Sequence, residues 1–308
     1  MQQFQTSRFT RRRVCAAALA GAAAIATRHP ARAQTPAAGG AISFRYLDLQ
    51  FTVPDNPQRV VVMEGRGDLE LATIAGLPVV ASANTFWPDE QPGSRLDGYA
   101  RPDITLLPVG DGFAPSFEDI LLQDPDLIVM RANGFRNDWY GNEQLAAIAP
   151  LLAVEVNRTV WREDLTGQMA QLGRQAAAAP FLERYDAEVA EARQTIDPLM
   201  SGKTVAFITA TTGNPIPLWT NDFAMAVCED LGLDQPFFDK TDDVGVELSA
   251  EQLTMLKDID LIMRQVESQE DAATVDALPT WQLLPAVKAG HVYDISPQFN
   301  TGSAITAR

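Results

Sequence analysis

The sequence is poor in the residues that build metal centres and in positive charge. Its 308 residues include two cysteines and two histidines, which excludes a zinc site of the Cys₄ or Cys₂His₂ kind within one chain. Lysine and arginine number 24 against 40 aspartate and glutamate, a formal charge of −16. This deficit argues against a nucleic-acid surface and against docking on anionic lipid, since both need basic patches. Beyond the N-terminus, no apolar run approaches the roughly 20 residues of a spanning helix.

The first 33 residues differ in composition from the rest, because they contain six arginines and no acid. Three arginines at 11–13 precede a mild apolar run at 14–26, and residues 31–33 have the small-x-small pattern of a cleavage site. These features predict an export signal of the twin-arginine type, cleaved after Ala33, and a periplasmic location. The alternative is a buried alanine-rich helix, but Pro30 and the flanking arginines fit it badly.

Removal of residues 1–33 would leave one cysteine, Cys228, and one histidine, His291. The formal charge of the remaining chain would be −22, from 18 basic and 40 acidic residues. No internal disulfide could form, so we expect the fold to depend on its apolar core. Cys228 lies in an amphipathic helical pattern and is expected to be a buried thiol, and His291 is expected in a turn that enters a strand.

The chain after residue 54 alternates short apolar runs with helical patterns. Continuous apolar runs are typical of strands buried on both faces of a parallel sheet. In the first half, we expect strands at 60–63, 78–83, 126–130 and 151–156, and helices at 68–75, 116–123 and 142–149. Ser116 is expected to cap its helix, because serine is favoured at that position. This alternation indicates an α/β fold.

The middle of the chain is helical, and the alternation then restarts. Helices are expected at 163–179 and 181–200, split by Pro180. In the second half we expect strands at 204–209, 216–219, 260–263 and 292–295, and helices at 222–231 and 249–256. The fold class is therefore α/β, with two Rossmann-like lobes that have mostly parallel central sheets and are joined by a long helical linker. The domain boundaries are a signal peptide at 1–33, a tail and lead-in strand at 34–53, an N-terminal lobe at 54–178, a linker helix at 179–201 and a C-terminal lobe at 202–308.

The two lobes echo one another, and the order of several motifs resembles a known family. PSFEDIL at 115–121 followed by DLIVM at 126–130 is echoed by LSAEQL at 248–253 followed by DLIM at 260–263. Further motifs are PQRVVV at 57–62, LATIAGLPVV at 71–80, LAAIAP at 145–150 and WQLLPAVKAGHVY at 281–293. Over residues 54–300 the chain resembles the periplasmic substrate-binding proteins of iron–siderophore and cobalamin ABC importers. The family usually has a further helix after the segment matching 299–303, so here that helix is very short or the chain is incomplete.

The resemblance implies a function without catalysis. A ferric siderophore would be captured between the lobes and delivered to membrane permease subunits by a monomeric protein. The ligand would bring its own iron, so no cofactor or protein metal site is expected. Cobalamin or haem is the alternative ligand. Some hydroxamate-binding relatives carry an arginine where this chain has Gly112 and Phe113, which disfavours a close match to hydroxamate ligands.

Rival functions find little support in the motifs. GRGDLE at 65–70 lacks the third glycine of a dinucleotide fingerprint, and its two acids would repel a pyrophosphate. An exported hydrolase is the weaker alternative, because there is no G-x-S-x-G elbow and a triad could use only His291.

Ligand sites of α/β lobes lie beyond the carboxyl ends of the strands. Arginine there offers a planar fork for carboxylate or catecholate oxygens, and aromatic rings offer flat apolar surface. The candidate ligand contacts in these loops are Arg66, Trp87, Arg131, Phe135, Trp139, Tyr140, Trp219, Arg264 and Phe299. The alternative for each arginine is a local ion pair, for example Arg66 with Glu64 or Asp68. The resemblance also implies that one exposed glutamate per lobe, Glu118 and Glu251, meets arginines of the permease.

Overall fold

The computed structural model describes residues 40–83, 103–109, 114–156, 159–213, 215–240, 245–297 and 301–307. The fold described below belongs to the unit of residues 37–308. The expected signal peptide, Trp87, Phe299 and the pair Gly112 and Phe113 lie outside the described residues. Among the helices that are described, none is both long and apolar enough to cross a membrane.

The first lobe is built on a five-stranded sheet in which every neighbouring pair is parallel. Its order is β5-β4-β3-β6-β7, with β3 at Val60–Val62, β4 at Val79–Ala83, β5 at Thr105–Leu107, β6 at Leu127–Arg131 and β7 at Leu151–Val154. The chain moves outward from β3 to β5 and then returns to place β6 on the other side of β3. The boundary between β3 and β6 is therefore the topological switch point, where doubly wound sheets bind ligands.

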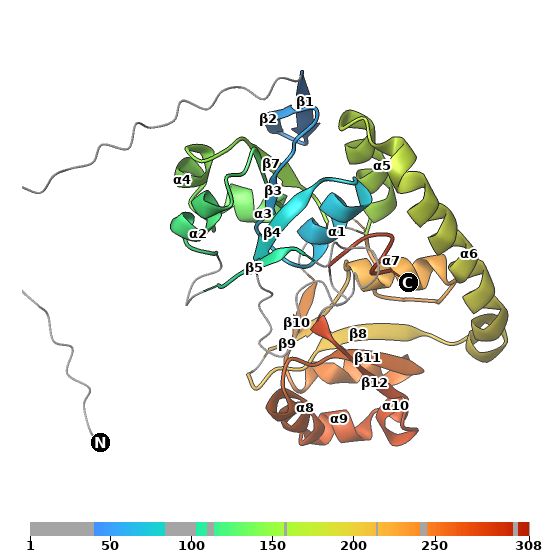
Figure 1. Cartoon of the computed structure of the whole chain (residues 1–308). Helices are drawn as coiled ribbons and strands as arrows, with labels where there is room; N and C mark the ends of the chain where they lie inside the picture. Colours follow the sequence, from blue (N-terminus) through green and yellow to red (C-terminus); the bar gives the residue numbers. More distant parts are fainter. Residues whose placement is uncertain are drawn as a thin grey trace, which may run out of the picture. The chain divides into compact units, whose positions relative to one another are not determined.

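Three helices of this lobe begin within one residue of the expected positions, whereas the helix expected at 163–179 runs from Trp161 to Gln171. Figure 1 shows their arrangement around the sheet. The helices of the lobe are α1 at Gly67–Ile74, α2 at Phe117–Leu122, α3 at Ala132–Arg136, α4 at Asn142–Ala146 and α5 at Trp161–Gln171. Ser116 caps α2 as predicted, because its hydroxyl accepts a hydrogen bond of 3.1 Å from the Asp119 backbone N–H. The α3 helix was not predicted, since residues 131–140 were expected to form a loop.

A β-hairpin precedes the first sheet where a tail and a single lead-in strand were expected. The antiparallel strands β1 (Ala41–Tyr46) and β2 (Leu49–Pro54) pair along their full length. Alternate side chains Phe44, Phe51 and Val53 are buried in the core of the first lobe. This period-two pattern is typical of strands with one buried face.

The prediction that Pro180 divides two helices is wrong. Helix α6 runs without interruption through Gln175–Met200. Pro180 is exposed in its second turn, so water can solvate the carbonyl that its missing N–H leaves free. The break lies instead at Gly173, whose φ of +67° follows the end of α5. The Gly173 N–H bonds to the Ala170 carbonyl and the Arg174 N–H to the Met169 carbonyl, which is the Schellman pattern that ends helices.

The second lobe has a sheet of order β10-β9-β8-β11-β12. Its parallel part is β8 (Val205–Thr209), β11 (Leu261–Gln265) and β12 (Val292–Ile295), and the antiparallel edge is β9 (Ile216–Leu218) and β10 (Val246–Leu248). The helices around this sheet are α7 at Phe223–Asp230, α8 at Gln269–Asp276, α9 at Pro279–Leu283 and α10 at Pro285–Lys288. Strand β12 has the predicted bounds.

The helix expected at 249–256 is a 3₁₀ helix, η2, at Gln252–Asp258. Ser249 and Gln252 form a reciprocal cap at its N-terminal end. The Ser249 N–H donates to Gln252 Oε1 at 2.8 Å, and Ser249 Oγ accepts from the Gln252 N–H at 3.4 Å. The Thr254 N–H then bonds to the carbonyl of Glu251, three residues earlier, as in a 3₁₀ turn.

The two lobes share part of one hydrophobic core. Phe223 and Ala226 of α7 belong to the same buried cluster as the first lobe. The Trp161 ring lies edge-on to Tyr185 of α6 at 5.0 Å and to Phe223 at 6.0 Å between ring centroids. The Tyr185 hydroxyl donates a 2.7 Å hydrogen bond to Asp230, at the end of α7. Through Tyr185, helix α6 thus contacts both α5 of the first lobe and α7 of the second.

Candidate functional site

A buried ion-pair cluster occupies the switch point of the first sheet. Glu64 follows β3 and Arg131 ends β6, so adjacent parallel strands bring them to the same sheet edge. One Glu64 carboxylate oxygen accepts a hydrogen bond from Arg66 Nε and the other accepts from a terminal nitrogen of Arg131. Burial alone would raise the pKa of Glu64, but the positive charges of Arg131 and Arg66 outweigh it and hold that pKa below its usual range.

Asp68 adds a second carboxyl to this cluster. It lies in the first turn of α1, is fully buried, and places Oδ1 3.8 Å from Arg131 Nε. Burial raises the pKa of Asp68 well above its usual range, and the charge of Glu64 acts in the same direction, while Arg131 opposes both. As the pH falls, the Asp68 carboxylate therefore takes up a proton before the Glu64 carboxylate does.

Tyr140 closes the cluster from the segment after α3. Its side chain is 2% exposed, and burial raises the pKa of its hydroxyl. Gly134 makes this position possible, since a Cβ there would lie 2.5 Å from the Tyr140 ring. Four buried atoms of the cluster have no hydrogen-bond partner among the described residues: the Tyr140 hydroxyl, Arg131 Nε and both Asp68 carboxyl oxygens. Buried polar atoms of this kind are rare in proteins and are expected at binding sites.

The other predicted aromatic residues of this lobe differ in position. Phe135 is half-buried and packs edge-on against Phe51 of the hairpin, with 5.0 Å between ring centroids. Its contacts are those of a core residue. Trp139 is 41% exposed and lies edge-on to Tyr140 at 6.4 Å. Of the two side chains, Trp139 is therefore the more exposed to solvent.

In the second lobe, Trp219 follows β9 and is half-buried. Its indole N–H donates a 2.7 Å hydrogen bond to the Thr209 hydroxyl at the end of β8. The ring lines a cavity of about 10 Å³ together with Phe207, Ile208, Asp222, Ala224, Gln265 and Ile295. Such a cavity has room for about one water molecule, so it is not a ligand pocket by itself.

Arg264 is occupied by structural contacts. Its Nε donates to Asp294 of β12 at 2.7 Å, and its Nη1 donates to Asp276 of α8 at 2.7 Å. The guanidinium also lies 5.7 Å from the centre of the Trp281 ring. Arg264 therefore faces α8 and α9, with no described contact to the cluster of Glu64, Arg66 and Arg131. Arg264 thus forms ion pairs within the second lobe.

A third buried carboxylate lies on the same helix as Asp68, and its role was not predicted from the sequence. Glu70 of α1 is 1% exposed and accepts five hydrogen bonds from the turn at 303–306. Gly302 is required beside it, because a Cβ there would lie 2.9 Å from Glu70 Oε2 and 2.4 Å from the Thr306 side chain. The turn thereby fixes the helix that carries Asp68.

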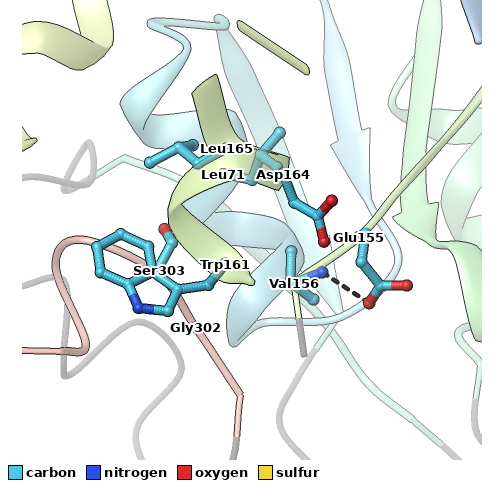
Figure 2. Close-up of a pocket in the computed structure, with 8 residues that line it drawn as sticks. All are labelled: Leu71, Glu155, Val156, Trp161, Asp164, Leu165, Gly302 and Ser303. Carbon is cyan, nitrogen blue, oxygen red and sulfur yellow. Dashed lines mark hydrogen bonds between the residues drawn. The ribbon is translucent and has the colours of Figure 1, made fainter. Parts of the chain in front are cut away.

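Figure 2 shows the small cavity beside this turn. Trp161, Asp164 and Leu165 of α5 line it, together with Gly302 and Ser303 and the residues Leu71, Glu155 and Val156. Its volume is about 10 Å³, again room for a single water. Within the described ranges, no three histidine, cysteine, aspartate or glutamate side chains are grouped so that they could hold a metal ion.

Two α/β lobes, each with a mostly parallel central sheet, and a polar cluster at a switch point define a two-lobed binding protein. The family model for periplasmic binding proteins matches residues 67–299, which is more than half of the chain. The chain belongs to the periplasmic binding protein family, whose members bind solutes.

Curated relatives cover most of the chain at low identity. The iron(3+)-hydroxamate-binding protein FhuD of Bacillus subtilis is 28% identical over 253 residues, 80% of this chain and 76% of the relative. The ferric enterobactin-binding periplasmic protein FepB of Escherichia coli is 26% identical over 269 residues, 80% of this chain and 81% of the relative.

Solved structures confirm the fold class. A FhuD-fold periplasmic binding protein of a ferrichrome ABC transporter from Bacillus subtilis superposes with a TM-score of 0.66, at 22% identity, over 86% of this chain and 94% of that one. Staphylococcus aureus SirA complexed with staphyloferrin B gives the same TM-score and coverage at 18% identity. These identities are low, so the structures establish the architecture alone.

Proposed function

We propose that this protein captures a ferric siderophore in the periplasm and delivers it to an ABC importer. The observation that carries the proposal is the buried cluster at the β3–β6 switch point, in a chain that belongs to a solute-binding family. The cluster offers guanidinium and phenol donors to ligand oxygens at the edge where such sheets bind ligands. The ligand brings the iron, so the protein contributes binding surface and no catalytic group.

The names of the relatives support this ligand class. FhuD is named for iron(3+)-hydroxamate, FepB for ferric enterobactin, and SirA was crystallised with staphyloferrin B. Three different siderophores are thus represented among proteins of this fold. Trp139 and Trp219 supply flat aromatic surface for such a ligand, one from each lobe.

The test is a calorimetric titration of the exported form against a panel of ligands. The panel contains a ferric hydroxamate, a ferric catecholate, ferric citrate, cobalamin and haem. We expect micromolar or tighter binding of at least one ferric siderophore. Binding of cobalamin or haem alone would contradict the proposal and favour the alternative ligands.

Export precedes capture in this proposal. Residues 1–33 direct the chain to the periplasm and are removed after Ala33, leaving a monomeric binding protein. If the signal is of the twin-arginine type, replacing both Arg11 and Arg12 by lysine should leave the precursor in the cytoplasm. Cell fractionation measures this distribution. Normal periplasmic yield of the double variant would show that a different export route is used.

Delivery uses one acid on each lobe, Glu118 and Glu251. Both are exposed, and neither forms an ion pair with another described residue. Hydrogen bonds from its own backbone and from Ser249 lower the pKa of Glu251, which keeps it charged. Four residues after each acid comes an exposed apolar side chain, Leu122 at 78% and Met255 at 48% exposure. An acid beside an apolar contact suits a basic partner surface on a permease subunit.

A further inference from the structure

The arginines that were expected to attract an anionic ligand are already neutralised by the protein. Each candidate arginine that the structure describes lies against at least one carboxylate. Arg66 pairs with Glu64, Arg131 with Glu64 and Asp68, and Arg264 with Asp276 and Asp294. The pairs at the switch point are buried, where an opposite charge is screened little by solvent and acts strongly.

The charge at the switch point is therefore small. Arg66 and Arg131 contribute two positive charges, and Glu64 contributes one negative charge. The described cluster is neutral when Asp68 is ionised and carries one positive charge when Asp68 is protonated. The whole chain has a formal charge of −16, which would become −22 without residues 1–33, so its long-range field repels anions.

The cluster offers hydrogen-bond donors, and beside them both Asp68 carboxyl oxygens are buried without a hydrogen-bond partner among the described residues. Arg131 Nε and the Tyr140 hydroxyl are buried and have no partner among the described residues, while Arg131 is 6% and Tyr140 2% exposed. Because the cluster as a whole has little net charge, its donors suit the oxygen atoms of a ligand that also has little net charge. A polyanion would need uncompensated cations to offset its loss of hydration.

We infer that the ligand is a ferric complex of little net charge, of the tris-hydroxamate type, and not a highly anionic tris-catecholate. This inference rests on the proposed function. Three hydroxamates carry one negative charge each and cancel the charge of Fe³⁺, whereas three catecholates carry two each and leave a charge of about −3. The expectation from Gly112 and Phe113 pointed against hydroxamates, but those two residues lie outside the described structure, and the charge argument does not depend on them.

The experiment compares ferrichrome, ferrioxamine B, ferric enterobactin and ferric citrate by calorimetry at low and high salt. We expect the two hydroxamates to bind at least about tenfold more tightly than the two anionic complexes, a difference of ~1.4 kcal/mol or more. Binding of ferrichrome, which is neutral, should change little with salt. Tighter binding of enterobactin or citrate would overturn the inference and leave the proposed function standing. Failure of all four to bind would instead refute the proposed function.

A charge variant tests the cause. Glu64→Gln removes one compensating charge, so affinity for ferric enterobactin should rise at least about tenfold while affinity for ferrichrome rises less. Glu191→Gln makes the same charge change on the exposed face of α6 and should leave both affinities unaltered. If Glu64→Gln fails to fold, Asp68→Asn is the second variant, with the same expected direction at a pH where Asp68 is ionised. An unchanged preference in a folded variant would refute the role assigned to the compensating acids.

Discussion

At the scale of single residues, the acids of the cluster matter as much as the arginines. Glu64 holds Arg66 and Arg131 in place, and removing one member of a buried ion pair typically costs about 3–5 kcal/mol of folding free energy. An alanine at either arginine would therefore lower both stability and affinity. More selective changes are needed to separate the two effects.

Two buried tyrosines provide such a comparison. The Tyr140 hydroxyl has no described partner, so Tyr140→Phe should leave the free energy of unfolding within about 0.5 kcal/mol and weaken ligand binding by about 1 kcal/mol or more. The Tyr185 hydroxyl bonds to Asp230 at 2.7 Å, so Tyr185→Phe should cost about 1–2 kcal/mol of stability and leave binding intact. Urea unfolding and calorimetry measure the two quantities. The reverse pattern would place the ligand away from Tyr140.

Asp222 makes the stability depend on pH. It caps α7 by accepting a 2.8 Å hydrogen bond from the Ala224 N–H, and burial raises its pKa to about 7. The folded protein then binds a proton that the unfolded chain releases near its ordinary pKa of about 3.9. The contribution of this group to stability is therefore present at low pH and is lost as pH rises from about 4 to 7.

Asparagine at this position should remove that dependence while keeping the cap. We expect Asp222→Asn to be more stable than the natural protein at pH 8, by at most about 4 kcal/mol, and to have lost the advantage near pH 4. Buried Asp68 acts in the same direction and is present in both proteins, so it cancels in the difference. Equal pH profiles of the two proteins in urea unfolding would contradict the assignment to Asp222.

At the scale of elements, a single glycine ends α5 and lets α6 begin. Gly173 has a positive φ and no atom within 4 Å of the position of a Cβ, so any cost of Gly173→Ala comes from backbone strain alone. We expect a loss of about 1–2 kcal/mol of stability. Gly167 within α5 has the same open surroundings but no positive φ, and Gly167→Ala should stabilise the protein by about 0.5–1 kcal/mol. Changes of equal sign in thermal unfolding would show that helix termination lies elsewhere.

Most elements could be predicted from sequence because parallel strands are continuous apolar runs between helical patterns. One failure has a local cause, because Pro180 lies where its missing N–H is harmless. The position of Arg131 at the sheet edge could be predicted, because it directly follows the strand expected at 126–130. The prediction that Arg264 contacts ligand stays a prediction; in the structure it lies two residues after buried Ile262 on β11 and shares the core-facing side. The bridging role of Glu64 depends on strand order, which a single sequence does not specify.

At the scale of the whole molecule, the proposed delivery requires both lobes to meet the membrane subunits. Glu118→Ala with Glu251→Ala should leave siderophore affinity unchanged and reduce uptake, because exposed ion pairs act mainly on orientation and association rate. The matched control replaces Glu183 and Glu191, two exposed acids of α6, by alanine. Uptake is measured with radioactive iron in cells that depend on this protein. Normal uptake by the first double variant would rule out these docking sites.

The turn that binds Glu70 has a consequence for the order of folding. Ser303 is separated from Glu70 by 233 positions, and the buried carboxylate depends on this turn for the five hydrogen bonds described above. Helix α1 is synthesised before residues 303–306, so Glu70 gains these hydrogen bonds only after that turn has been made. Contacts so distant in sequence form late. We therefore expect the turn at 303–306 to dock on α1 late in folding.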